Sequence, residues 1–115
     1  MIKLTKKIFG CPICVTASPA GSDWIVTVLG GCSPHVGSVS LAEYNNGSVL
    51  LQTLQRENHK DRIVGDHFAT VLAEQKQCSV CVSCGIHYDN ADGQQLQKIV
   101  AAANELLIQL CERIK

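Results

Sequence analysis

Apolar and polar residues in the first half of the chain follow the short, alternating pattern that is typical of β-strands. Residues 9–17 and 24–29 are two such runs, and the Ser-Pro-Ala-Gly-Ser sequence between them is a turn. Residues 36–44 and 49–54 are two more, separated by Asn45-Asn46-Gly47, whose residue types tolerate the positive φ angles of a tight hairpin turn. The pattern therefore predicts two successive β-hairpins.

In the second half the apolar period changes to that of amphipathic helices. Residues 60–75 carry an apolar stripe at helical spacing, and Asn58 with Asp61 forms a capping-box-like start. Residues 79–83 are a fifth β-prone run. Residues 91–114 form the strongest helical pattern, whose stripe comprises Leu96, Ile99, Val100, Ala103, Leu107, Leu110 and Ile114.

The resulting order of elements, ββββαβα, predicts an α+β fold. We expect a two-layer α/β sandwich in which two helices cover one face of a mainly antiparallel sheet of about five strands. No repeat, low-complexity tract or linker divides the 115 residues, so one domain over 1–115 is expected. The second face of the sheet is expected to be partly open, which favours self-association into a homo-oligomer.

The charge balance narrows the choice of partners. Ten basic and ten acidic residues give a formal net charge of zero, and neither sign forms a long block. This balance lacks the electrostatic footprint of a nucleic-acid-binding protein. No stretch approaches the roughly 20 apolar residues that cross a bilayer, and the first ten residues lack the apolar core of a secretory signal. We expect a cytoplasmic protein with no nucleic-acid or membrane partner.

Seven cysteines include two clusters, Cys11-Pro-Ile-Cys14 and Cys78-Ser-Val-Cys81-Val-Ser-Cys84. Thiolates two residues apart can converge on zinc or on an iron–sulfur cluster. In the second cluster, however, strand alternation puts Cys78 and Cys84 on one face and Cys81 on the other. The sequence therefore favours reduced cysteines that pack as small hydrophobic residues over a thiolate metal site.

Three loops between the predicted elements carry histidine, and the first of them, residues 30–37, is rich in glycine. Gly30, Gly31 and Gly37 allow the backbone to approach a ligand closely and to form an anion-binding nest. A plain turn with a bulge explains the same composition at least as well. His35, in this loop, is either a structural hydrogen-bonding residue or part of a ligand site.

The second loop opens the first predicted helix with His59-Lys60-Asp61-Arg62. A helix N-terminus attracts anions through its partial positive charge, and Lys60 and Arg62 add two cations to it. Because cations are mildly unfavourable at that end of a helix, their presence indicates a bound phosphate or carboxylate. Two solvated side chains are the alternative interpretation.

The third loop, Gly85-Ile86-His87-Tyr88-Asp89, follows the fifth predicted strand. A histidine at a strand end beside glycine is well placed to face a cleft, and a carboxylate two residues later can orient its imidazole. Asp89 with Asp92 also fits an N-cap pattern for the last helix. We expect His35, His59 and His87 around one cleft, with Asp89 close to His87.

The three loops together resemble a known family. In this order, Gly30-Gly31-x-x-Pro34-His35-Val36-Gly37, His59-Lys60-Asp61 and Gly85-Ile86-His87-Tyr88-Asp89 are similar to motifs of the LpdD-like proteins. These are named for the small D subunit of gallate decarboxylase and are described as prenylated-flavin chaperones. The resemblance extends from Trp24 through the last helix. The cysteine before Gly85 and the N-terminal Cys-Pro-Ile-Cys depart from the pattern, but no motif histidine is lost.

The resemblance implies an accessory protein rather than an independent enzyme. Such a protein holds prenylated FMN or FMN and supports the large subunit of an aromatic acid decarboxylase, with a flavin prenyltransferase as a second partner. The sequence shows no evident nucleophile–base pair or acidic dyad of its own. The implied cofactor-binding residues are Gly30, Gly31, His35, Gly37, His59, Lys60, Arg62, His87 and Asp89.

Two alternatives to the flavin chaperone come from other classes of protein. Histidines with a carboxylate suit zinc or non-haem iron, so the chain could be a small metal-dependent hydrolase or a metal-binding protein. The ligands would then be His35, His59, His87 and Asp89. A structural subunit without a ligand is the third interpretation.

Overall fold

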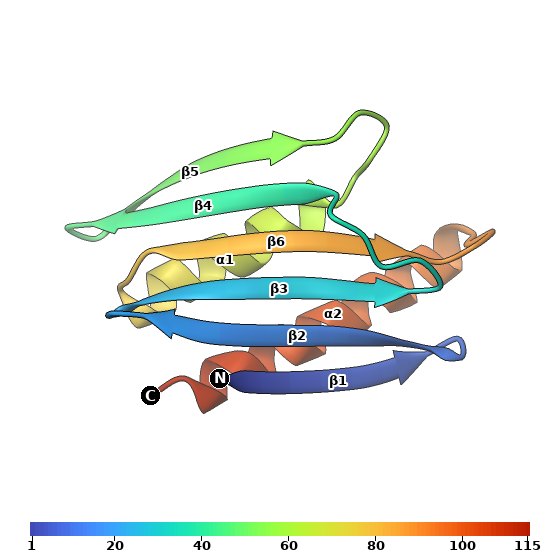
Figure 1. The fold of residues 1–115 in the computed structure, drawn as a ribbon, viewed down its shortest axis with the longest axis horizontal. Helices are drawn as coiled ribbons and strands as arrows, with labels where there is room; N and C mark the ends of the chain where they lie inside the picture. Colours follow the sequence, from blue (N-terminus) through green and yellow to red (C-terminus); the bar gives the residue numbers. More distant parts are fainter.

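One mixed sheet of six strands forms the front layer of the molecule, and both helices lie behind it (Figure 1). The computed structural model describes all residues from 1 to 115. The strands are β1 (Ile2–Ile8), β2 (Cys11–Ala20), β3 (Asp23–Gly31), β4 (Ser38–Asn45), β5 (Ser48–Gln55) and β6 (Val80–His87). The helices are α1 (Arg62–Lys76) and α2 (Gly93–Arg113). The predicted α+β class and the helices on one face are confirmed.

Both predicted hairpins are present, as β2–β3 and β4–β5. The second turns at Asn46 and Gly47, whose φ angles are 51° and 86°, as a tight turn between right-twisted strands requires. The strand that sequence analysis missed is β1. Lysines interrupt its apolar pattern, and it is held at the sheet edge by pairing with β2 and by the 2.8 Å ion pair between Lys6 and Glu105 of α2.

The order of strands in the sheet is β1-β2-β3-β6-β4-β5. The last strand in sequence, β6, therefore lies between β3 and β4, parallel to β3 and antiparallel to β4. The segment 32–37 that joins β3 to β4 must cross the end of β6, and Figure 1 shows this crossing. Four of the five strand pairings are antiparallel, so the mainly antiparallel sheet is confirmed.

The core lies between the sheet and the two helices. Alternate residues of β2, β3 and β6 are fully buried there, and the inner faces of α1 and α2 cover them. The predicted stripe of α2 needs correction at its start, because Leu96 and Val100 are 53% and 47% exposed. Helix α2 extends beyond the sheet at that end, so these two side chains border a surface pocket instead of the core.

The cysteines follow the predicted strand alternation. Cys78 and Cys84 are buried, whereas Cys81 points to the opposite face of the sheet. Cys11 and Cys14 lie three residues apart on β2 and likewise point to opposite faces. Burial raises the pKa of the Cys84 thiol to about 12, which favours the neutral, packed form. Neither cluster brings its sulfur atoms to one point.

The front face of the sheet has no covering layer (Figure 1). Five large apolar side chains are exposed on it, namely Ile25, Val39, Leu41, Leu50 and Leu54. The open face that sequence analysis predicted is therefore present. Neither helix contains a stretch that is both long enough and apolar enough to cross a membrane.

A partly buried carboxylate, that of Asp66, fastens α1 to the sheet. Asp66 accepts hydrogen bonds from the hydroxyls of Ser40 on β4 and Thr53 on β5, and from Arg62 at 3.2 Å. Burial alone would raise the pKa of Asp66, but these hydrogen bonds outweigh it and lower the pKa below its usual value. Gly65 lets the helix approach this closely, since a Cβ there would already lie 3.1 Å from the Ser38 hydroxyl.

We predict that Asp66→Asn destabilises the protein at pH 7 by about 1–3 kcal/mol, because an acceptor of three hydrogen bonds is weakened. A pKa that is lower in the folded state contributes stability above the unfolded value of about 3.9, and this is lost as the pH falls through the folded-state pKa. Denaturant unfolding should therefore show the two proteins converging as the pH falls below the unfolded-state pKa and through the lower folded-state pKa.

A matched control is Glu105→Gln, which removes an exposed ion pair and should cost about 1 kcal/mol or less. A difference between wild type and Asp66→Asn that stays constant from neutral to acidic pH would contradict the assignment.

Candidate functional site

The three histidine loops leave the sheet at the same end and surround one pocket. At this end lie the carboxyl ends of the parallel strands β3 and β6, the carboxyl end of β5 and the start of β4. The pocket has a volume of about 800 Å³. Its walls come from the segments 33–35, 56–64 and 86–88 and from the first two turns of α2.

The pocket depends on two glycines where the crossing segment meets β6. Gly85 faces the open side of the sheet directly beneath the crossing, and a Cβ there would overlap the backbone carbonyl of His35. Gly31 has a φ of +84°, and a Cβ there would overlap the carbonyl of His87. Both positions therefore require glycine for close packing of one loop on another.

The other motif glycines serve the same kind of contact. A Cβ on Gly37 would overlap the carboxylate of Asp61, and one on Gly30 would lie 2.7 Å from the Cα of Ile13. None of Gly30, Gly31 and Gly37 lines the pocket. The close approach predicted from sequence is real, but its partners are other parts of this chain.

Asp61, in the second loop, links that loop to both of the others. Its Oδ1 accepts a 2.9 Å hydrogen bond from the backbone N–H of Ile86, and its Oδ2 lies 3.0 Å from Nε2 of His35. The Asp61 side chain is only 9% exposed. The sequence-based capping box is wrong here: Asn58 has a φ of +60° outside the helix, and the N-cap residue Asp61 makes no side-chain capping bond because β6 and His35 occupy its carboxylate.

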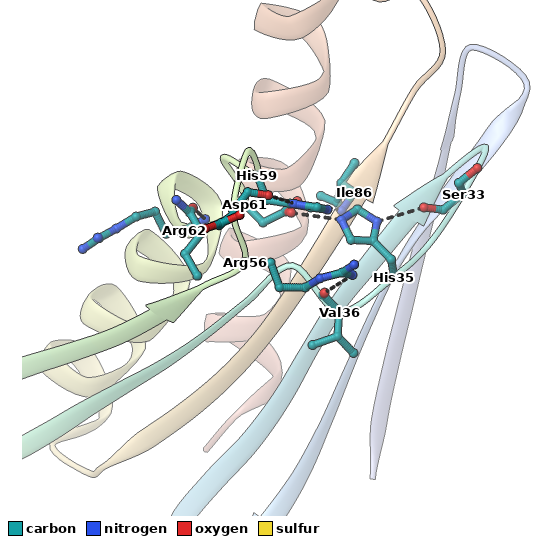
Figure 2. Close-up of polar contacts among 10 residues, drawn as sticks. Ser33, His35, Val36, Arg56, His59, Asp61, Arg62 and Ile86 are labelled. Atoms are coloured by element: carbon teal, nitrogen blue, oxygen red, sulfur yellow. Dashed lines mark hydrogen bonds and ion pairs between the residues drawn. The ribbon is translucent and has the colours of Figure 1, made fainter.

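His35 and His59 face each other beside this carboxylate, with ring centroids 5.0 Å apart (Figure 2). Nδ1 of His35 lies 3.0 Å from the carbonyl oxygen of Ser33, and Nδ1 of His59 lies 2.7 Å from that of Glu57. A carbonyl oxygen only accepts hydrogen bonds, so both Nδ1 atoms carry hydrogen. The Nε2 atoms are the ones that turn toward Asp61 and the pocket.

His87 also lines the pocket but forms a separate pair. Its Nε2 lies 3.0 Å from Oδ1 of Asp89, as expected for a carboxylate that orients a histidine. Asp89 does not start the last helix; Asp92 is its N-cap and forms a capping box with Gln95.

Two cations at the pocket have no acidic partner, Lys60 and Arg56. Arg56 donates to the carbonyl oxygen of Val36 at 3.0 Å (Figure 2). Arg62 differs from expectation, because it pairs with Asp66 at 3.2 Å and does not line the pocket. The only carboxylate in the wall, that of Asp61, is nearly buried and already paired. The uncompensated charge at the pocket is therefore positive.

Apolar side chains from both helices and β6 also line the pocket, and we call them the apolar wall: Ile63, Val64, Ile86, Leu96, Ile99 and Val100. Tyr88 completes it, fixed by a 3.0 Å hydrogen bond from its hydroxyl to the carbonyl oxygen of Cys11 and by an edge-on contact with Phe9. Arg56, Tyr88 and the apolar wall are not among the predicted site residues. The helical spacing of Leu96 and Val100 predicts buried core positions, whereas both side chains line the pocket.

The structure thus brings His35, His59, His87 and Lys60 to one pocket. It does not bring together the four metal ligands considered from sequence, since His87 and Asp89 pair with each other. The group whose potential ligand atoms all lie within 4.8 Å of one another is His35, His59 and Asp61.

The family model of the prenylated flavin chaperone LpdD-like domain matches residues 7–115. The chain belongs to this family. The match confirms the resemblance seen in the three loop motifs and extends it toward the N-terminus through β2. No curated protein sequence matches the sequence of this chain.

Among solved structures, the fold is similar to a chain from a chaperone complex for yeast 20S proteasome assembly. The TM-score is 0.51 at 14% sequence identity, with 94% of this chain and 95% of that chain covered. At this identity the similarity concerns the fold alone. The LpdD-like domain thus has a sheet-and-helix architecture that also occurs outside its own family.

We predict that Gly85→Ala disrupts the pocket by pushing the His35 segment away from β6. Overpacking of this kind costs about 1–3 kcal/mol, which thermal unfolding would detect, and the imidazole NMR signals of His35 and His59 should shift. Gly93→Ala is the matched control, because nothing lies within 4 Å of a Cβ at that helix start. Equal stability and unchanged histidine signals in Gly85→Ala would contradict the crossing contact.

Proposed function

We propose that this LpdD-like domain binds prenylated FMN in the pocket and delivers it to the large subunit of an aromatic acid decarboxylase. The observation that carries the proposal is that the pocket lining combines apolar side chains with two cations, Lys60 and Arg56, that have no acidic partner. A flavin with an added prenyl group has matching parts, a large apolar ring system and an anionic phosphate tail.

The size and donor set of the pocket fit this ligand. Its volume of about 800 Å³ lies within the range of roughly 300–1,000 Å³ that is usual for small-molecule sites. We assign the phosphate to Lys60 and Arg56, which lack other charged partners. The ring system then packs on the apolar wall beside Tyr88, with His87 at its polar edge.

The role is one of binding rather than catalysis. Prenylated FMN itself supplies the chemistry of adding or removing a carboxyl group on aromatic acids. The residues of this chain bind and orient the cofactor, and the apolar wall shields one side of it from water. Because the pocket opens at the end of the sheet, the cofactor can enter from a flavin prenyltransferase and leave to a decarboxylase.

We predict that protein co-expressed with a flavin prenyltransferase is purified with a bound flavin chromophore, seen by absorbance and mass spectrometry. Lys60→Ala should weaken binding of prenylated FMN and FMN about ten-fold or more, since a charge-assisted hydrogen bond contributes roughly 1.5–3 kcal/mol. Titration followed by flavin fluorescence measures the change, and riboflavin, which lacks the phosphate, should respond little to the substitution.

Two controls sharpen the test. Lys3→Ala removes an exposed lysine outside the pocket and should leave flavin affinity unchanged. Arg62→Ala should have a smaller effect than Arg56→Ala, because Arg62 is paired with Asp66. Equal affinity of wild type and Lys60→Ala for FMN would overturn the phosphate site, and absence of any chromophore after co-expression would overturn the function.

We further propose that two copies associate through the open face of the sheet. The centre of that face is apolar, with Ile25, Val39 and Leu41 exposed. Its charged residues lie toward opposite edges, lysines on β1 and Glu43 on β4. A two-fold axis parallel to the strands would bring the basic edge of one copy over the acidic side of the other.

We predict that Leu41→Glu abolishes this self-association, because it buries a charge against an apolar partner face. Sedimentation equilibrium should show a dimer for wild type and a monomer for the variant, with flavin affinity per chain unchanged. Ile108→Glu, on the helical side, is the control and should remain dimeric. A wild-type protein that is monomeric at high concentration would rule the interface out.

A further inference from the structure

Three electron-pair donors converge on one point of the pocket wall. Nδ1 of His35 and Nδ1 of His59 each donate to a backbone carbonyl, so Nε2 is the free nitrogen of both rings. Nε2 of His35 lies beside Asp61, and the potential ligand atoms of all three residues lie within 4.8 Å of one another. In a neutral imidazole the second nitrogen is an acceptor, as is the ionised carboxylate. Lone pairs facing one another at hydrogen-bond distance repel, so this point requires a cation between the groups.

A proton on His35 can meet that requirement, and so can a metal ion. Nε2 of His35 and Oδ2 of Asp61 are 3.0 Å apart. Zinc binds nitrogen and oxygen ligands at about 2.0–2.2 Å, which puts the ligand atoms of a tetrahedral site roughly 3.3–3.6 Å apart. The His35–Asp61 pair therefore needs to open by only a few tenths of an ångström to share an ion. His59 has its ligand atom within 4.8 Å of both and is half-exposed on its loop, so a small side-chain shift brings it into range.

The hydrogen bonds around these three side chains are of the kind that orient the ligands of a metal centre. Histidine ligands in proteins donate their second ring N–H to a carbonyl or carboxylate, which fixes the ring and raises its basicity. Ser33 and Glu57 supply such carbonyls here. The second oxygen of Asp61 is held by the N–H of Ile86, so the carboxylate is oriented too. Figure 2 shows the three side chains directed at one another, His35 from the segment between β3 and β4, and His59 and Asp61 from the loop before α1.

We propose that His35, His59 and Asp61 bind one divalent transition-metal ion of the zinc class. Two imidazoles and one carboxylate select Zn²⁺, Co²⁺ or Fe²⁺ over Mg²⁺ and Ca²⁺, which prefer all-oxygen sites. Three protein ligands leave at least one coordination position open, and it faces the pocket, where an oxyanion can bind. The site differs from the set considered from sequence, because Asp61 takes the place of His87 and Asp89.

The proposal does not depend on flavin binding and is tested without flavin. Chelator-treated, dialysed protein is titrated with Zn²⁺ by calorimetry and with Co²⁺ by visible absorption. We expect one ion per chain, no binding of Mg²⁺ under the same conditions, and a Co²⁺ spectrum without the intense near-ultraviolet band of a thiolate ligand.

Variants assign the ligands. His59→Ala and Asp61→Asn should each lower Zn²⁺ affinity at least ten-fold. Asp61→Asn keeps an oxygen for the N–H of Ile86. His59→Ala removes a ring whose only other polar contact is a backbone carbonyl, so His59→Ala still tests the site if Asp61→Asn does not fold. His87→Ala, His67→Ala and Cys32→Ser should bind within two-fold of wild type.

Three results would overturn the site: no saturable binding of Zn²⁺ or Co²⁺, affinity that His59→Ala leaves unchanged, or affinity that Cys32→Ser or His87→Ala removes. The first would mean that a proton alone bridges His35 and Asp61. None of these results bears on the flavin proposal, because FMN titrations of the same protein in excess chelator report on that separately.

Discussion

The position of β6 between β3 and β4 is the constraint on which the rest of the pocket depends. Because these two strands are not neighbours, the six residues between them must cross the end of β6, and they lie in direct contact with it. Gly85 supplies the flat surface for that crossing, since any side chain there would occupy the path of His35. The crossing fixes His35 in space and brings the first loop beside the other two.

A single carboxylate then ties the remaining loops to this crossing. Asp61 reaches from the start of α1 to the backbone of β6 and to His35, and Gly37 leaves room for it. The carboxylate gives up the ordinary capping role at its helix to do so. Its charge is consequently internal to the wall, and the free charge that an incoming ligand meets is that of Lys60 and Arg56.

The same end of the molecule thus combines two kinds of recognition. The apolar wall and the unpaired cations suit an amphipathic anion such as a flavin phosphate, whereas the His35–His59–Asp61 group suits a small cation. The two are compatible, because a metal ion with an open position attracts oxyanions rather than competing with them. Membership of the prenylated flavin chaperone LpdD-like family supports the proposed flavin binding, whereas the proposed metal binding rests on hydrogen-bond geometry alone.

Local pattern in the sequence determined the α+β class, the two hairpins, both helices and the three histidine loops, because alternation, helical period and turn residues act over a few positions. Tertiary structure alone decided which loops meet. It turned Leu96 and Val100 from a predicted core stripe into pocket wall, and it made Asp61 a bridge instead of a cap. Each outcome depends on β6 entering the sheet between β3 and β4, a pairing between residues some forty to sixty positions apart that no local pattern encodes.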